Sequence, residues 1–418
     1  MPSKALIQAA GDFDRRRSFA ELGIRGGEQL SVDIAAVLAR VRKIRDELVD
    51  ETLELTRSLG ERAISGRARL LGPGTVIVNG VELRAHRIIL ATGSRPIVPD
   101  AWTPFADRLL TTDSLFEQST LPPRLAVLGL GCVGTELAQA LARLGLHVTA
   151  FDDKALICGL SDPRVNGTLL EALRRDLTVH LGHEARLFAG GDGIHVKAGP
   201  EEVAVDRVLV ALGRRRNLDA LGLETLGVVL DEHGRPEVDR ATMQIGKLPV
   251  FLAGDANGDV PVQHEASDEG HIAGVNAATQ SFDGSTRRTP LSIVFCDPNV
   301  ALVGQRMSQL DPTQTVVGEA SFDRQGRARL MLSNSGTIRV HANLEDGMLL
   351  GAELCAPAGE HLAHFLALGI HRRSTVLELL RAPFYHPSLE EGLRSALRDA
   401  AKHLPNDGDG TPDALNGV

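Results

Sequence analysis

A glycine-rich segment, Gly129-Leu130-Gly131-Cys132-Val133-Gly134, has the residue types and the spacing that bind a dinucleotide. It directly follows the apolar run 125–128, and apolar residues recur after it at the three- and four-residue intervals of a helix. The first glycine permits a tight turn, the second lets a pyrophosphate approach the backbone, and the third lets the helix pack on the strand. Because free N–H groups at a helix N-terminus favour an anion, we expect Gly129, Gly131 and Gly134 to contact a dinucleotide cofactor.

The next apolar run, 148–151, ends at Asp152. A carboxylate at this position can accept hydrogen bonds from both hydroxyls of a ribose, and no arginine follows it directly. The sequence therefore predicts NAD in preference to NADP. A glycine-rich turn in another kind of α/β protein is the alternative, although the complete strand-turn-helix-strand frame disfavours it.

The composition indicates a modular enzyme and excludes several other classes. A chain of 418 residues has room for about two to four domains. A net charge of −9 and 3% aromatic residues argue against a nucleic-acid partner. No apolar run has the length of a membrane span, and the N-terminal residues lack the apolar core of a signal peptide. We therefore expect a cytoplasmic protein with no membrane partner.

The four cysteines, Cys132, Cys158, Cys296 and Cys355, lie far apart in the sequence and form no CxxC pair. Zinc sites and local redox disulfides are usually recognised by such closely spaced pairs. The sequence thus predicts neither a metal site nor a local redox disulfide.

Several elements must position the residues named above. We expect an amphipathic helix that starts at a Ser31 cap, ends at Gly60 and covers a sheet. Short strands with hairpin turns are expected between residues 64 and 90, followed by a proline-marked linker from Pro96 to Pro104. From Thr289 onward, alternating strands and then helices indicate an α+β domain.

Three buried strands share a design in which an apolar run ends in glycine. The runs 88–91, 207–212 and 250–253 lead into Thr92-Gly93, Gly213 and Gly254-Asp255 respectively. Small residues at a strand end let a ligand approach the backbone, and a carboxylate there suits a sugar or polyol hydroxyl.

In this order, the segments resemble the class I pyridine nucleotide-disulfide oxidoreductases, a flavin-dependent family, and within it the dihydrolipoyl dehydrogenases. Residues 2–6 resemble the segment after the second redox cysteine of that family, and 384–387 with Glu391 resemble its C-terminal catalytic stretch. The resemblance implies an α/β fold with FAD- and NAD(P)-binding Rossmann-like domains, the FAD domain lacking its first βα unit, and a C-terminal α+β dimerisation domain. The implied parts are residues 1–120 and 241–288 (FAD-binding), 121–240 (NAD-binding), 289–403 (dimerisation) and 404–418 (disordered tail).

The resemblance also implies roles for individual residues. Lys4 is expected beside the flavin N5, paired with Glu136, because a buried cation stabilises an anionic reduced flavin. Thr92, Gly93, Gly254 and Asp255 are implied as FAD contacts, and Gly213 and His264 as further cofactor contacts. The alternatives are that Lys4 and Glu136 are ordinary surface charges and that Asp255 is a turn residue.

His386 is implied as the base that takes a proton from the dithiol, with Glu391 orienting its imidazole. The competing interpretation is that Ser388 and Glu391 form a capping box and that His386 is a surface residue. Arg216 stands where the family commonly has proline, which we expect to affect a turn only.

Compared with the family, the sequence starts after the first FAD strand, its glycine-rich turn and helix, and the Cys-x4-Cys pair. We expect a chain shortened by about fifty residues, most simply because the start codon is placed too late, and inactive as printed. An in-frame glycine motif and cysteine pair upstream would confirm this expectation, whereas a stop codon would contradict it.

The implied function passes electrons from a dihydrolipoyl dithiol through a disulfide and FAD to NAD. It requires a homodimer, in which His386 serves the partner subunit's disulfide, and a lipoyl-bearing protein of a 2-oxo acid dehydrogenase complex or a glycine cleavage system. Val294, Phe295 and Leu350 suit either the dimer interface or the core. The alternatives are an enzyme like mercuric reductase, disfavoured by the lack of a paired-cysteine tail, an enzyme like a flavin transhydrogenase, and a catalytically silent NAD-binding remnant.

Overall fold

The computed structural model describes residues 2–191, 193–279 and 284–405. Two compact units contain them. Unit 1 comprises the residues up to Arg45, Val98–Leu212 and the residues from Thr289 onward, and unit 2 comprises Asp46–Ile97 and Gly213–Arg288. Of the expected disordered tail, residues 406–418 lie outside the described residues. No helix in the described ranges combines the length and apolarity needed to cross a membrane.

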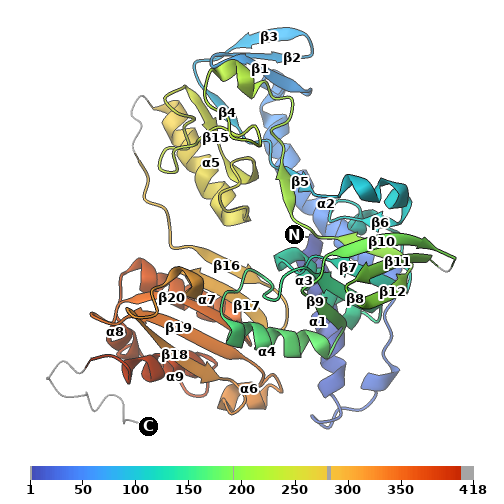
Figure 1. The fold of residues 1–418 in the computed structure, drawn as a ribbon, viewed down its shortest axis with the longest axis vertical. Helices are drawn as coiled ribbons and strands as arrows, with labels where there is room; N and C mark the ends of the chain where they lie inside the picture. Colours follow the sequence, from blue (N-terminus) through green and yellow to red (C-terminus); the bar gives the residue numbers. More distant parts are fainter. Residues whose placement is uncertain (1, 192, 280–283, 406–418) are drawn as a thin grey trace. The chain divides into compact units, whose positions relative to one another are not determined.

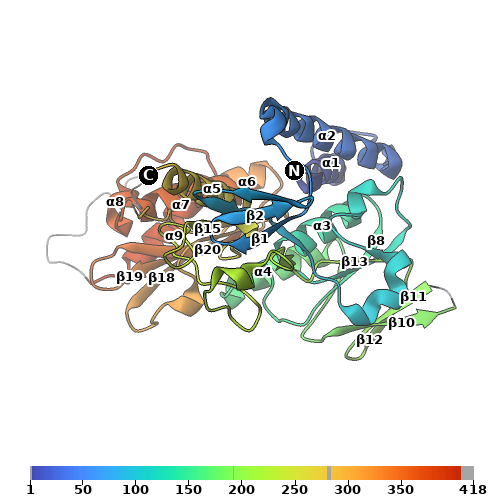
Figure 2. The same ribbon diagram turned by 90° about the horizontal axis from the view of Figure 1, so that it is seen from above.

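Unit 1 contains a five-stranded parallel sheet with the order β6-β13-β7-β8-β9. The strand β7 is buried along its apolar run 125–128, as expected for a parallel strand covered on both faces. Helix α1 packs against α3, which follows β7 directly (Figure 2). The strands and helices of this part are β6 (Leu109–Leu110), β7 (Arg124–Leu128), β8 (His147–Asp152), β9 (Thr178–Leu181), β13 (Arg207–Val210), α1 (Pro2–Asp14), α3 (Cys132–Arg143), α4 (Pro163–Arg174) and α2 (Ile34–Ser58), which belongs to unit 1 up to Arg45.

A three-stranded antiparallel sheet, β10 (Ala185–Gly190), β11 (Gly193–Ala198) and β12 (Glu201–Val205), is inserted between β9 and β13. Its inward-facing residues form a core cluster with β7 and β13.

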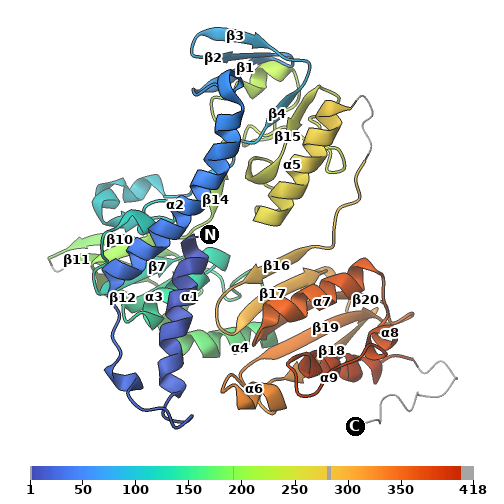
Figure 3. The same ribbon diagram turned by 180° about the vertical axis from the view of Figure 1, so that it is seen from behind.

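The C-terminal part of unit 1 is an antiparallel sheet of order β16-β17-β20-β19-β18, against which α7 and α9 pack (Figure 3). This confirms the predicted α+β domain. Val294 is fully buried in β16 and thus belongs to the core, whereas Phe295 and Leu350 are half-buried. The elements are β16 (Leu291–Val294), β17 (Asn299–Gly304), β18 (Thr315–Ser321), α6 (Gly326–Leu330), β19 (Thr337–Asn343), β20 (Leu349–Ala356), α7 (Gly359–His371), α8 (Val376–Leu380) and α9 (Glu390–Ala401).

Unit 2 begins within α2, at Asp46, and its first strands form the antiparallel meander β1-β2-β3 (Figure 1). Its Asn79-Gly80 turn has positive φ at both residues, 51° and 81°, as a two-residue hairpin requires. Strands β4 and β15 pair in parallel, and β5 pairs with β14 antiparallel. The elements are β1 (Ala68–Gly72), β2 (Thr75–Val78), β3 (Val81–Arg84), β4 (Ile88–Leu90), β5 (Ser94–Pro96), β14 (Arg214–Arg216), β15 (Val250–Leu252) and α5 (Gln263–Ala278).

Two local predictions differ from the structure. Helix α2 begins at Ile34 and not at Ser31, because the Asp33 carboxylate accepts a hydrogen bond from the Ala36 N–H at 3.0 Å and so satisfies the first turn. The expected linker after Pro96 is largely a 3-10 helix, Asp100–Arg108, whose Trp102 is buried. Apolar residues within a proline-rich stretch were the available signal for it.

Candidate functional site

The glycine turn between β7 and α3 has the geometry of a phosphate-binding loop. Gly129 has φ +95°, and a Cβ there would lie 2.5 Å from the Ala211 carbonyl oxygen. A Cβ on Gly134 would lie 1.8 Å from the Gly129 oxygen, so α3 can approach β7 only with glycine at this position. At Gly131 a Cβ would meet no atom within 4 Å. The space over Gly131, at the first turn of α3, therefore fits a pyrophosphate group.

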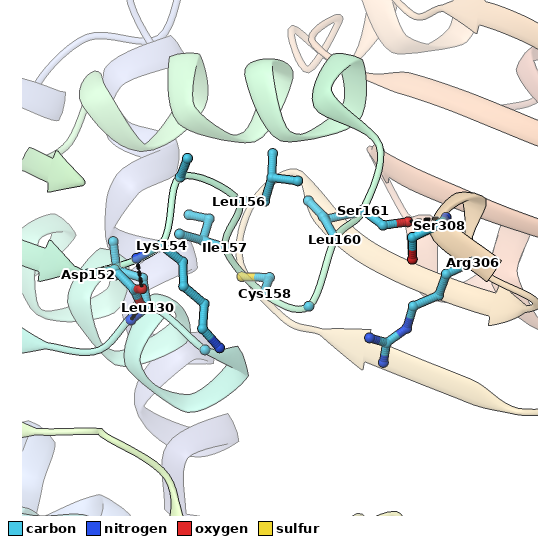
Figure 4. A pocket seen from close by; sticks show the side chains of 13 residues that line it. Leu130, Asp152, Lys154, Leu156, Ile157, Cys158, Leu160, Ser161, Arg306 and Ser308 are labelled. Atoms are coloured by element: carbon cyan, nitrogen blue, oxygen red, sulfur yellow. Dashed lines mark hydrogen bonds between the residues drawn. The ribbon is translucent and has the colours of Figure 1, made fainter. Parts of the chain in front are cut away.

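Asp152 is bound to this turn by its carboxylate. Its Oδ2 accepts a hydrogen bond from the Leu130 N–H at 2.6 Å, and its Oδ1 accepts one from the Lys154 N–H at 2.9 Å. Asp152 also lines a cavity of about 540 Å³ together with Leu130 and Gly131 (Figure 4). This volume is in the range of small-molecule sites, and two of the predicted cofactor residues, Gly131 and Asp152, lie on its wall.

Lys4 of α1 and Glu136 of α3 form an ion pair although 132 positions separate them in the sequence. The Lys4 Nζ lies 2.7 and 2.6 Å from the two carboxylate oxygens and 4.5 Å from the centre of the Phe295 ring. Glu136 also accepts a hydrogen bond from the Phe295 N–H at 2.8 Å. The Glu136 side chain is only 4% exposed, so it is not an exposed first-turn acid.

The four cysteines are free thiols in unit 1. Burial raises the pKa of Cys132 and of Cys158, and it raises the pKa of Cys296 to about 12. Burial likewise raises the pKa of Cys355 well above its usual value. Because the thiolate is the reactive form, these four side chains are poor nucleophiles.

His386 and Glu391 lie in hydrogen-bond contact. The His386 Nδ1 is 3.0 and 3.1 Å from the two Glu391 oxygens, and the imidazole side chain is 79% exposed. Although partial burial opposes it, the hydrogen bond to His386 lowers the pKa of Glu391. With Nδ1 facing a carboxylate, Nε2 is the ring nitrogen able to exchange a proton.

The capping box expected at Ser388 is only half formed. Glu391 accepts a hydrogen bond from the Ser388 N–H at 3.1 Å, but the Ser388 hydroxyl has no hydrogen-bond partner in the described part of the chain. Helix α9 begins at Glu390, with Leu389 as the preceding residue. Glu391 thus contacts both the helix entry and His386. No hydrogen bond or ion pair between described residues joins His386 to the Lys4–Glu136 pair.

In unit 2, the strand ends of β4 and β15 bring Thr92-Gly93 and Gly254-Asp255 into one region. The Ser94 hydroxyl donates to the Asp255 Oδ2 at 2.6 Å, and Thr92 donates to the Asn217 carbonyl at 2.8 Å. Gly93 and Gly254 both have φ +69°. A carboxylate and hydroxyls beside two left-handed glycines suit the polyol hydroxyls of a flavin nucleotide.

The two other predicted cofactor residues of unit 2 are Gly213 and His264. Gly213 has φ +100° directly before β14. The His264 side chain is half-exposed in α5, with Nε2 3.9 Å from a Glu265 oxygen.

Sequence reasoning missed several residues that organise these regions. Glu269 is buried and accepts a hydrogen bond from the Gly254 N–H at 2.8 Å, and Arg214 donates to the Ser94 hydroxyl at 2.7 Å. Glu353 is fully buried and accepts hydrogen bonds from Ser161, Asp162 and Met307. Ser94 and Arg214 directly follow the glycine-ended strands and could have been found there, whereas an acid within a helix or strand carries no such signal.

Comparison with sequence families gives two matches. The pyridine nucleotide-disulphide oxidoreductase model matches residues 1–278, and the dimerisation domain model of the same enzymes matches residues 291–397. Dihydrolipoyl dehydrogenase of Thermus scotoductus is 31% identical over 97% of this chain and 90% of its own length. Mercuric reductase of Acidithiobacillus ferrooxidans is also 31% identical, over 95% of this chain and 74% of its own length.

Solved structures resemble the fold over most of its length. LpdA from Mycobacterium tuberculosis superposes with a TM-score of 0.82 at 25% identity, covering 95% of this chain and 89% of the other. The flavoprotein disulfide reductase RclA from Escherichia coli superposes with a TM-score of 0.81 at 20% identity, covering 95% and 88%. The second likeness concerns the fold alone.

Proposed function

This chain belongs to the class I pyridine nucleotide-disulfide oxidoreductase family, and we propose that it oxidises the dithiol of a dihydrolipoyl group with FAD and NAD. The family binds FAD and NAD(P), and the dimerisation domain supports a homodimer. In the balanced reaction the two thiols lose two electrons and two protons as the S–S bond forms. NAD⁺ takes both electrons with one proton as a hydride, and the second proton is released.

The Lys4–Glu136 pair is the observation that carries this proposal. Bound FAD would supply two-electron transfer between a sulfur pair and the nicotinamide. The Lys4 ammonium lies 2.6 Å from the buried carboxylate of Glu136, which is one turn into α3, the helix that follows the glycine motif. In the proposal this cation offsets negative charge that develops beside the dinucleotide site. A helix pair with a purely structural role could bury apolar side chains here at lower cost.

In the proposal His386 is the base of the dithiol. Glu391 holds Nδ1–H, so that Nε2 accepts the thiol proton and later returns it. The imidazole is largely exposed, in accord with service to the partner subunit's site in a homodimer. We propose a lipoyl-bearing protein of a 2-oxo acid dehydrogenase complex or a glycine cleavage system as the substrate.

The remaining predicted contacts are part of the same proposal. Thr92, Gly93, Gly254 and Asp255 would hold FAD, and Gly129, Gly131, Gly134 and Asp152 would form the NAD site. Gly213 and His264 are proposed as further cofactor contacts. Residues 1–120 and 241–288 would bind FAD, 121–240 NAD, and 289–403 would form the dimer.

None of the four thiols of this sequence fits the redox disulfide, because burial raises the pKa of each of them. The reaction therefore needs a sulfur pair that they do not form. We expect no dithiol turnover when these four cysteines are the only thiols of the chain, and turnover by a chain extended at its N-terminus with a segment that carries a Cys-x4-Cys pair. An extended chain without turnover would refute the proposed reaction.

His386→Gln tests the base in that extended chain. Loss of a general base should lower kcat for dihydrolipoamide oxidation by about 10²-fold or more. His361→Gln, an exposed histidine of α7, is the matched control and should leave kcat unchanged. Equal kcat for His386→Gln and the control would refute the assignment.

The 31% identity to a mercuric reductase favours a second candidate, nicotinamide-dependent reduction of Hg²⁺. The His386–Glu391 pair favours the thiol substrate, because a proton acceptor is needed to make a thiolate. Assaying the extended chain with dihydrolipoamide and with Hg²⁺ separates the two. A colourless protein that binds NADH would instead indicate a silent remnant, whereas flavin absorption bands indicate an enzyme.

A further inference from the structure

Helix α5 packs against the turn that carries Asp255. The helix lies beside β4, β15 and the 3-10 turn Gly254–Ala256 that follows β15 (Figure 3). The Ala253 N–H still donates to a carbonyl of β4 at 3.0 Å, whereas the Gly254 N–H donates to the Glu269 Oε2 of α5 at 2.8 Å. A side chain of α5 thus accepts the first backbone hydrogen bond after the pairing of β15 with β4 ends.

Glu269 holds both ends of this turn. Its other oxygen, Oε1, accepts a hydrogen bond from the Asn257 side chain at 3.2 Å, and the Asn257 N–H donates to the Gly254 carbonyl at 2.8 Å. Glu269 and Asn257 are buried, whereas the Asp255 side chain between the two ends is partly exposed. One buried carboxylate therefore fixes the backbone on either side of Asp255 and leaves the Asp255 carboxylate accessible to a ligand.

Arg287 supplies the positive charge beside this carboxylate. Its Nη2 lies 3.1 Å from the Glu269 Oε1 and also contacts a Glu265 oxygen. Glu265 and Glu269 are both buried and lie four residues apart on α5, a spacing at which like charges repel each other. The Arg287 guanidinium therefore offsets two carboxylates that are largely out of contact with water.

The neighbouring arginine binds the same helix at another place. The Arg288 Nε lies 2.9 Å from the Asp268 Oδ2, and the Arg288 side chain is exposed. Adjacent residues of a helix do not face each other, so Asp268 and Glu269 leave α5 in different directions. In the ranges that the structure describes, neither Arg288 nor Asp268 is hydrogen-bonded to residues 254–258. This second ion pair is therefore a matched control for the first.

From this arrangement we infer that Glu269 and Arg287 are positioning residues of the proposed FAD site. They hold the Gly254–Ala256 turn in the conformation that presents the Asp255 carboxylate to the flavin polyol. The inference rests on the proposed binding of FAD at this turn. A ligand binds more tightly to groups that are already held in the bound geometry, because less conformational entropy is lost on binding. Arg287 acts here through Glu269 and does not contact the flavin.

Hydrogen–deuterium exchange of the full chain without added FAD tests the positioning directly. We expect Arg287→Gln and Glu269→Gln each to speed exchange at residues 253–258 by about tenfold or more, because a charge-assisted hydrogen bond is lost or weakened. Arg288→Gln and Asp268→Asn should leave this exchange within about twofold of the parent. Arg287→Lys keeps the positive charge and should restore part of the protection.

Titration of the same flavin-free chains with FAD, followed by flavin fluorescence, tests the consequence for binding. Arg287→Gln and Glu269→Gln should raise the Kd of FAD by about tenfold or more. The Kd of NAD⁺ should stay within about twofold of the parent, because the glycine turn at 129–134 belongs to unit 1. Arg288→Gln and Asp268→Asn should change neither Kd. If Arg287→Gln does not fold, Arg287→Lys should weaken FAD binding where Arg288→Lys does not.

Equal exchange rates and equal FAD affinities in the Arg287 and Arg288 variants would overturn the inference and leave the proposed function intact. Arg287 and Glu269 variants that unfold at lower urea concentration but keep the parent's Kd for FAD would also overturn it, because the pair would then have a structural role alone. If the parent chain binds no FAD, the inference fails together with the proposed FAD site. Faster exchange and weaker FAD binding, combined with no dithiol turnover by the extended chain, would uphold the inference and refute the proposed reaction.

Discussion

At the scale of single residues, the fold of unit 1 depends on glutamates whose carboxylates are buried and accept hydrogen bonds. Glu136 is stabilised by Lys4 and by the Phe295 N–H, and Glu353 by four donors from two segments. An ionised carboxylate out of contact with water is tolerated only with such partners. Removing a partner should therefore cost more than a typical surface substitution.

Lys4→Met should lower the free energy of unfolding by about 2 kcal/mol, because it leaves the Glu136 carboxylate with one donor in a buried position. Urea unfolding at pH 7 measures this change. Lys402→Met is the control, since that exposed lysine pairs with Asp399 at the surface, and it should cost less than about 0.5 kcal/mol. Equal effects of the two variants would show that the Lys4 pair behaves as a surface pair.

The lowered pKa of Glu353 predicts how the free energy of unfolding depends on pH. Although burial opposes it, the hydrogen bonds from Ser161, Asp162 and Met307 lower the pKa of Glu353 from its usual 4.5 in the folded chain. Its ionised form therefore stabilises the fold above about pH 4.5, and this contribution is lost as the pH falls through the lower folded pKa.

Glu353→Gln should lower the free energy of unfolding at pH 7 by about 2 kcal/mol, and by much less at pH 3. Urea titrations at the two pH values give the difference. Glu345→Gln, in the exposed loop before β20, provides the control and should leave both values near those of the parent. A Glu353→Gln deficit that is the same at both pH values would contradict the pKa shift.

At the scale of elements, the strand-turn-helix unit shows that three glycines in one motif have separable roles. Gly134 is required by packing, since a Cβ there would lie 1.8 Å from the Gly129 oxygen. Gly131 has open space around it and is required only if a ligand comes close to the backbone.

Gly134→Ala should destabilise the fold by about 2 kcal/mol or more, because α3 must move away from β7. Gly131→Ala should change the free energy of unfolding by less than about 0.5 kcal/mol and yet raise the Kd of NAD⁺ by about tenfold or more. Thermal unfolding and calorimetry separate the two effects. Unchanged NAD⁺ binding in Gly131→Ala would show that the phosphates do not lie on this turn.

At the scale of the whole molecule, family matches over residues 1–278 and 291–397 cover both units, and the second is a dimerisation domain. In that domain Tyr385 is 84% exposed and directly precedes His386. A large aromatic side chain of this kind is typical of the centre of an interface. The dimer and the proposed base would then be formed by the same segment.

Tyr385→Ser should therefore weaken the dimer and raise its dissociation constant by about tenfold. Sedimentation velocity over a range of concentrations measures the shift. Val229→Ser alters an equally exposed apolar residue of unit 2, at 89%, and should leave the dimer unchanged. If both variants keep the parent's Kd, Tyr385 lies outside the interface.

What the sequence alone could determine depends on local backbone rules. The glycine turn at 129–134, the Asn79-Gly80 hairpin and the α+β pattern after Thr289 are each set by conformations that few residue types adopt or by a short repeat of apolar positions. Such signals are contained within about ten residues, and they were predicted correctly. Helix α1 and the helical stretch after Pro99 were not predicted.

The tertiary structure alone decided which distant residues meet. The pairing of Lys4 with Glu136 could be predicted only from the family resemblance. Two other features were not predicted at all: the hydrogen bond by which Glu353 holds the Met307 N–H, and the position of Arg306 at the Asp152 cavity. Each of these contacts depends on the order of strands in a sheet and on helix packing. Many different sequence separations between two residues are compatible with the same strand order or the same helix packing. The physical reason is that a charge in a sequence has no assigned neighbour until the chain folds, whereas a glycine at positive φ shows its backbone requirement in the residue itself.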